Sequence, residues 1–249
     1  MKKYIIILVL MICGLSLKSQ KISGTIKYTV IHDWLKKMET NEFMSQANRE
    51  RMAYVWGQNN IWTEYSLLTF NSTTTEYKEL EKYNDAGPSY SWRSDEYIIH
   101  RNFEDNRMYD VIRMLNKLYV INDTIIKINW KIKNDMREIA GHICMNASYK
   151  DTLLNKNIVA WFALDIPYSF GPETYCGLPG IILEIDMNNG AVIITAEKIE
   201  ISQNEITIDK PKHKKNAKIV SKKEFDKEIE KVVEDSKKQK TAYFYKIRY

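Results

Sequence analysis

Residues 160–186 constrain the fold more than any other part of the sequence, because two apolar segments flank a loop dense in proline and glycine. Residues 158–164 are apolar without alternation, which is typical of a strand covered on both faces. Residues 181–185 form a second apolar strand, and Asn188, Asn189 and Gly190 predict a hairpin turn after it. We therefore expect a rigid loop that crosses one end of a β-sheet.

The prolines and glycines of this loop have predictable backbone roles. Pro179 and Gly180 are the central residues of positions 178–181 and predict a type II turn, in which Gly180 has a positive φ. Pro167 and Pro172 each remove a backbone donor and favour an extended conformation in the residue before them. The residues with an expected structural role are Pro167, Gly171, Pro172, Gly177, Pro179 and Gly180.

The same loop carries large apolar side chains, for which two interpretations stay open. They plug the core of the sheet, or they frame the mouth of an apolar ligand site. These candidate binding residues are Tyr168, Phe170, Tyr175 and Leu178.

Alternating apolar and polar residues predict strands along most of the chain. Residues 126–133 alternate most clearly, so we expect one face of that strand to meet the core and a turn to follow at Asn134 and Asp135. Further strands are expected at residues 25–31, 52–56, 61–70, 73–83, 97–101, 107–111, 117–121, 137–148, 191–196, 197–208 and 243–249.

Two regions favour helices. Residues 33–50 are polar and contain methionines, with Thr40 as their one β-branched residue, and Asp33 or Thr40 is the expected N-cap. Ser221 and Glu224 match a capping box, and an apolar stripe follows at helical spacing. The stripe consists of Phe225, Ile229, Val232 and Val233. Residues 84–95 are expected to form a long exposed loop.

These elements predict a mainly β fold, a single domain over residues 21–249. Its expected architecture is a curved antiparallel sheet or incomplete barrel, with an early helical excursion and a C-terminal amphipathic helix.

Residues 1–20 have the layout of a secretory signal peptide, with Lys2 and Lys3 before an apolar run and small residues at its end. The run is too short for a membrane span. We expect the mature chain to be periplasmic or extracellular and not to span the membrane. Without Lys2, Lys3 and Lys18 the 37 basic residues become 34 against 32 acidic ones. This balance gives no electrostatic case for nucleic-acid binding.

The hexapeptide Gly177-Leu178-Pro179-Gly180-Ile181-Ile182 resembles the signature of the GLPGLI family, uncharacterised secreted proteins of the bacterial envelope. Ile181 replaces the leucine of the signature and keeps its apolar bulk. Surrounding blocks resemble the family in the same order, over residues 129–132, 138–147, 160–162, 166–167 and 170–172. The resemblance implies an envelope location and a β-rich domain, without an established activity or catalytic residues.

Few residues form patterns that are typical of a metal site or of a catalytic site. His142 and Cys144 lie on one face of a strand and are a weak candidate metal pair, which Cys176, Asp165 or His100 would have to complete. Cys144 and Cys176 either form a disulfide, stay buried thiols, or bind a metal. The sequence has no phosphate-loop ending and no serine nucleophile elbow, and we expect no cofactor.

Three functional hypotheses follow. The leading one is a non-enzymatic envelope binding or accessory module for an apolar ligand or a peptide added at an open sheet edge. The second is a secreted hydrolase or a thiol- or metal-dependent enzyme that uses His142, Cys144 and Asp165. The third is a structural subunit of an outer-membrane transport assembly, with a transport component as partner.

Overall fold

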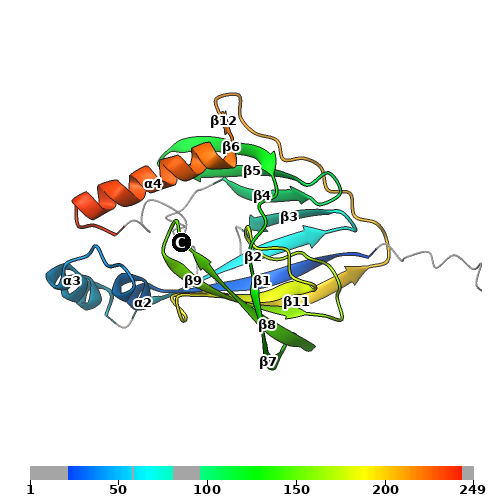
Figure 1. The fold of residues 1–249 in the computed structure, drawn as a ribbon, viewed down its shortest axis with the longest axis horizontal. Coiled ribbons are helices and arrows are strands. Elements are labelled where there is room, and N and C mark those ends of the chain that lie inside the picture. Colours follow the sequence, from blue (N-terminus) through cyan, green and yellow to red (C-terminus); the bar gives the residue numbers. More distant parts are fainter. Residues whose placement is uncertain (1–21, 58, 81–95, 243–249) are drawn as a thin grey trace, which may run out of the picture.

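The computed structural model describes residues 22–57, 59–80 and 96–242. Within them, the strands form one sheet of 12 strands in the order β12-β6-β5-β4-β3-β2-β1-β11-β10-β9-β8-β7. Neighbouring strands are antiparallel except for the parallel pair of β12 and β6. The sheet is strongly curved, and its two end strands lie on opposite sides of the view in Figure 1. The predicted fold class is confirmed: a mainly β, open and curved sheet with small early helices and a C-terminal helix.

The bounds of the elements follow the chain. The strands are β1 (Ser23–Asp33), β2 (Ile61–Phe70), β3 (Thr74–Glu79), β4 (Tyr97–Asn102), β5 (Arg107–Met114), β6 (Lys117–Thr124), β7 (Lys131–Ile139), β8 (His142–Asp151), β9 (Lys156–Ala163), β10 (Ile181–Met187), β11 (Val192–Ser202) and β12 (Lys218–Val220). The helices are α2 (Trp34–Glu39), α3 (Gln46–Trp56) and α4 (Lys222–Lys238).

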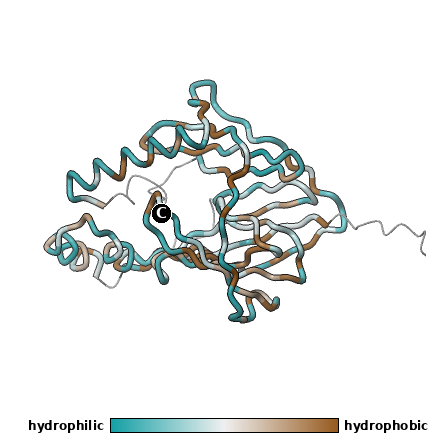
Figure 2. Tube along the Cα trace, viewed as in Figure 1, coloured by the Kyte–Doolittle hydropathy of each residue, from teal (hydrophilic) through white to brown (hydrophobic). Residues whose placement is uncertain are grey.

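The main core lies on one face of the sheet. Tyr28 on β1, Phe70 on β2 and Phe162 on β9 are fully buried there, and Ile185 on β10 joins them. We call this side of the sheet the core face. Figure 2 shows hydrophobic positions along the strands and a mostly hydrophilic α4. The few apolar residues of α4 nevertheless pack on this core, with the ring of Phe225 edge-on to Tyr119 of β6 at 5.2 Å. The predicted apolar stripe of this helix is therefore confirmed.

Local capping explains where the helices begin. The backbone N–H of Glu224 donates to Ser221 Oγ, and the Glu224 carboxylate accepts from the Ser221 backbone, so the predicted capping box is confirmed. Asp33 accepts a hydrogen bond from the Lys36 backbone at 3.1 Å and caps α2. Thr40 is the C-cap of α2, so its alternative assignment as an N-cap was wrong.

The strand predicted at residues 52–56 was wrong, because these residues end helix α3. Ser45 accepts a hydrogen bond from the Asn48 backbone and caps that helix. Tyr54 and Val55 are 90% and 67% exposed, so their β-forming side chains have no sheet to pack on.

The amphipathic strand predicted at residues 126–133 is confirmed only for residues 131–133, which begin β7, and was wrong for residues 126–130. Residues 125–130 are not in a strand, and Ile126 is 51% exposed. Asn134 and Asp135, predicted as a turn, lie inside β7. The chain turns instead at Ala140 and Gly141, which both have positive φ values.

Other predicted segments match the sheet. The hairpin at residues 188–190 joins β10 to β11, and Asn188, Asn189 and Gly190 all have positive φ. Residues 203–208, predicted as strand, lie beyond the end of β11. The signal peptide at residues 1–20, the loop at 84–95 and the last strand at 243–249 lie outside the described residues. The single-domain prediction stays a prediction.

Candidate functional site

Residues 164–180, which we call the clasp, connect β9 to β10 across the core face. The Phe170 ring lies 4.6 Å from the Phe103 ring and 6.2 Å from the Phe70 ring. Backbone hydrogen bonds hold the loop to itself and to β10, among them Ile182 N to Phe170 O at 2.8 Å. The clasp is therefore an ordered part of the core.

Gly180 has a different role from the one predicted. Its φ is not positive, so the predicted type II turn was wrong. A Cβ atom at Gly180 would lie 2.0 Å from the carbonyl oxygen of Ala163, so the glycine permits a close approach between the clasp and the end of β9. The positive φ of the clasp glycines is at Gly177, at +91°. Gly171 and Pro172 are buried, whereas Pro167 and Pro179 are exposed.

The predicted binding residues divide by burial. Phe170 and Leu178 are 3% and 1% exposed, whereas Tyr168 and Tyr175 are half-buried. Tyr168 stacks on Phe170 with the ring centres 5.0 Å apart. This packing favours the plug interpretation, and a ligand-binding role for the four side chains stays a prediction.

A buried polar cluster lies where the clasp meets β4 and β9. Lys156 and Glu173 are 6% and 5% exposed, and the Tyr97 hydroxyl donates to the Glu173 carboxylate. Burial lowers the pKa of Lys156 to about 8, although Asp151 and Glu173 oppose that shift. Burial also raises the pKa of Tyr175. The cluster thus joins three separate parts of the chain through ionisable side chains.

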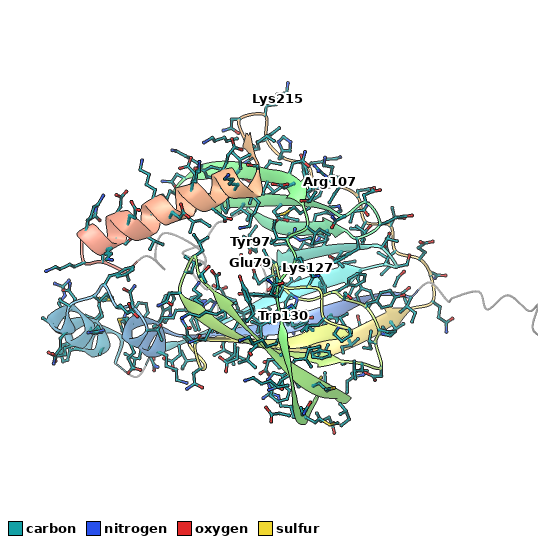
Figure 3. All side chains as sticks on the ribbon, in the orientation of Figure 1. Glu79, Tyr97, Arg107, Lys127, Trp130 and Lys215 are labelled. Carbon is teal, nitrogen blue, oxygen red and sulfur yellow. The ribbon has the colours of Figure 1, made fainter. Side chains whose placement is uncertain are left out.

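The segment before β7 is attached to the clasp. The Trp130 indole N–H donates to the Cys176 carbonyl oxygen at 2.9 Å, and its ring lies 6.2 Å from the Tyr175 ring. Figure 3 shows Trp130 and Lys127 on this segment as it crosses the view of the sheet, with Tyr97 and Glu79 higher in the view than Trp130.

The structure brings together two of the three residues of the enzyme hypothesis. His142 Nδ1 lies 2.7 Å from Asp165 Oδ2, and both side chains reach solvent. Cys144 is fully buried, and burial, reinforced by Asp165, raises the pKa of its thiol to about 11. Because a thiolate is the reactive form, this cysteine is poorly suited to act as a nucleophile.

Among the described residues, the cysteines and the candidate metal ligands form neither a disulfide nor a metal site. Cys144 and Cys176 are both buried free thiols, so the disulfide alternative is not formed in this structure. Within the described residues, no three side chains of histidine, cysteine, aspartate or glutamate are grouped to hold a metal ion. His142 and Cys144 therefore have no third ligand there, and His100 is buried on β4.

Strand β7 is the open edge of the sheet and the most exposed of the described strands. Among the described strands β7 pairs with β8 alone, and every residue from Lys131 to Glu138 is exposed. Ile132 pairs with Ala147, and Met136 with Met145, whose partner on β9 is Phe162. Side chains that are directly opposite in a sheet share a face, so Ile132 and Met136 lie on the core face.

This edge leaves apolar surface uncovered. Ile132 and Met136 are 53% and 65% exposed, and Ile143 on β8 is 55% exposed. The pairing of β7 with β8 is irregular between Ile132 and Met136, which interrupts the ladder near the middle of the strand. The sequence analysis predicted an open sheet edge, but the residue pattern did not indicate which strand forms it.

None of the described helices is both long and apolar enough to cross a membrane.

Comparisons with known proteins give a partial family match and a fold. A family described as "Protein of unknown function (Porph_ging)" matches residues 150–184, which contain β9 and the clasp. No curated protein matches the chain.

Two solved structures are similar to this chain, described as PNGF-II in the C2 and P21 space groups. The first is 13% identical over 86% of this chain with a TM-score of 0.51, and the second is 14% identical over 85% with a TM-score of 0.52. This chain spans about a third of the length of those proteins, 33% in both cases. At this identity the similarity establishes the fold alone. Part of the chain thus resembles a family of unknown function, on a fold that also occurs within longer proteins.

Proposed function

We propose that the mature protein is a non-enzymatic binding or accessory module of the bacterial envelope, which takes an extended polypeptide segment as an added strand at β7. Support for the envelope assignment comes from the signal-like residues 1–20 and from the GLPGLI-like motif at residues 177–182. That motif lies inside the stretch that matches a family of unknown function. A component of an outer-membrane transport assembly is the partner that this location favours.

One observation carries the proposed binding mode: an exposed edge strand whose apolar side chains continue the core face of the sheet. Unpaired backbone groups at an edge are a template for another strand, and side-chain contacts then select the partner. Ile132 and Met136 provide such contacts on the core face. Each favourable cross-strand pair contributes about 0.2–1 kcal/mol.

The other candidate surfaces support binding less well. Phe170 and Leu178 are buried in the clasp and cannot touch a ligand without its displacement. Strand β12 at the opposite end of the sheet has three residues, so it offers a short template. We therefore assign binding to the unpaired edge of strand β7.

Site-specific photocrosslinking tests this function. The mature chain carries a photoreactive amino acid in place of Met136, or in place of Tyr54 on α3 as an exposed control away from the edge. After irradiation with solubilised envelope proteins, mass spectrometry identifies the crosslinked segment, which is then synthesised. We expect this peptide to slow amide hydrogen exchange within residues 131–139.

Paired substitutions provide the control. Ile132→Asp with Met136→Asp removes the apolar contacts, whereas Tyr54→Asp with Val55→Asp places the same charges on an exposed helix face. We expect loss of the protection in the first variant and its retention in the second. Protection of another element, with β7 unchanged, contradicts the proposal.

A further inference from the structure

The two faces of β7 carry different chemistry. Lys131 pairs with Ser148, whereas the next residue, Ile132, pairs with Ala147 on the core face. Lys131 lies on the outer face with Ser148. Ile132 and Met136 both lie on the core face, and Asp135 bonds to Asn146 on the outer face, so alternation continues through the irregular stretch and places Lys133 on the outer face. An added strand therefore meets Ile132 and Met136 on the core face, with the exposed carboxylate of Glu138 at the end of that row, and lysines on the outer face.

The other two charged residues on the outer face of β7, Asp135 and Arg137, each have a described partner. Asn146 Nδ2 donates to Asp135 Oδ2 at 2.9 Å. Arg137 forms an ion pair with Glu184, and its guanidinium lies 4.0 Å above the centre of the Trp161 ring.

By contrast, Lys131 and Lys133 are exposed and form no ion pair with any residue that the structure describes. The outer face of the edge thus carries two lysines without an ion pair among the described residues, followed by the carboxylate of Asp135, and an apolar row lies on the opposite face.

We infer that the segment bound at β7 alternates apolar residues with acidic ones, the apolar side chains covering Ile132 and Met136 and the carboxylates facing Lys131 and Lys133. This inference rests on the proposed function and names the chemistry of its partner. Exposed lysines on an edge oppose pairing with most strands, since they need a partner for their charge. The same lysines select an acidic segment, because opposite charges across a strand pair attract and like charges repel.

A second copy of this chain fits the edge less well. In an antiparallel pair of β7 strands, the register that sets Lys133 opposite Asp135 also sets Lys131 opposite Arg137. The register that sets Lys131 opposite Asp135 sets the two copies of Lys133 opposite each other. Each arrangement leaves a like-charge pair, so the charges favour a different polypeptide as the occupant.

Two matched synthetic peptides test the inference with the mature chain. In the first, valine and isoleucine alternate with glutamate, except for a serine at the position that faces Asp135, and in the second each glutamate is replaced by lysine. Affinity is measured by fluorescence anisotropy, and the bound segment by hydrogen exchange. We expect the acidic peptide to bind at least about tenfold more tightly than the basic one and to protect residues 131–139.

Charge reversal provides the control. Lys131→Glu with Lys133→Glu should invert the preference of the edge between the two peptides. Lys223→Glu with Lys231→Glu makes the same charge change on α4 and should leave the preference unchanged.

The outcomes separate the partner chemistry from the proposed function. Equal binding of both peptides, with β7 protected, overturns the acidic preference and leaves strand addition intact. A dimer in sedimentation whose interface protects β7 overturns the choice of occupant. Failure of the acidic peptide to protect β7 also overturns the inference, whereas strand addition is judged separately by the segment crosslinked at Met136.

Discussion

Replacing Lys156 with methionine tests the buried cluster that anchors the clasp. Lys156 is 6% exposed, and burial lowers its pKa from 10.5 to about 8. Methionine has a similar length and no charge. The variant therefore removes one titration while it keeps most of the packing at the start of β9.

The size and sign of the effect follow from the two pKa values. Between pH 8 and 10.5 the unfolded chain holds the lysine proton and the folded protein has released it, so this group makes unfolding less favourable as pH rises. The lysine contribution is fully present above pH 10.5 and is lost as pH falls to 8. At about 1.4 kcal/mol for each pH unit, the change amounts to about 3 kcal/mol.

Urea unfolding followed by tryptophan fluorescence measures this difference at a series of pH values. The free energy of unfolding of the wild type, minus that of Lys156→Met, should rise by about 3 kcal/mol from pH 7.5 to 10.5. The subtraction cancels the groups that both proteins share, including Cys144, whose raised pKa lowers stability between pH 9 and 11. Lys150→Met, at an exposed site on β8, should give a flat difference. Parallel curves for wild type and Lys156→Met would refute the reasoning.

Two further predictions concern the clasp and the thiols. Gly180→Ala should lower the free energy of unfolding by about 3 kcal/mol or more, because its Cβ would overlap the Ala163 carbonyl oxygen, whereas Gly177→Ala should cost about 1–2 kcal/mol through its positive φ. Urea unfolding compares the two, and equal losses would contradict the close-approach role of Gly180. At pH 8 a thiol reagent should modify Cys144 and Cys176 slowly in the folded mature chain and rapidly in urea, since both are buried. Rapid reaction of either thiol in the folded protein would contradict this burial.

Features that depend on neighbouring residues could be predicted from the sequence. The Ser221 capping box needs a serine and a glutamate three residues apart, and the hairpin at residues 188–190 needs residues that tolerate positive φ. Each of these patterns depends on contacts between residues that are only a few positions apart in the sequence. They gave the C-terminal helix and the hairpin of β10 and β11 correctly.

Other predictions failed because one residue type serves different structural needs. Glycine at position 180 fits a type II turn, but it also fits a close backbone approach, and the second need decides this site. Residues 126–133 alternate like a strand, yet alternation does not show whether a neighbouring strand or a covering layer exists. Ile126 and Ile132, which the alternation predicted to face the core, are therefore exposed in the structure.

The polar cluster could not be predicted because topology creates it. Tyr97 and Glu173 are 76 residues apart and meet because the clasp crosses the core face. Lys156 stands between two asparagines, a sequence context that suggests an exposed turn. The open edge at β7 likewise depends on the strand order, which no local pattern contains.

Hydrogen exchange at β7 tests the central claim most directly. Amide exchange in residues 131–139 is measured for the mature chain, alone and with the synthetic peptide of the segment crosslinked at Met136. Strand addition predicts slower exchange there on binding, and loss of that protection in the variant with Ile132→Asp and Met136→Asp. A bound peptide that leaves exchange in β7 unchanged and protects the clasp instead would contradict the account.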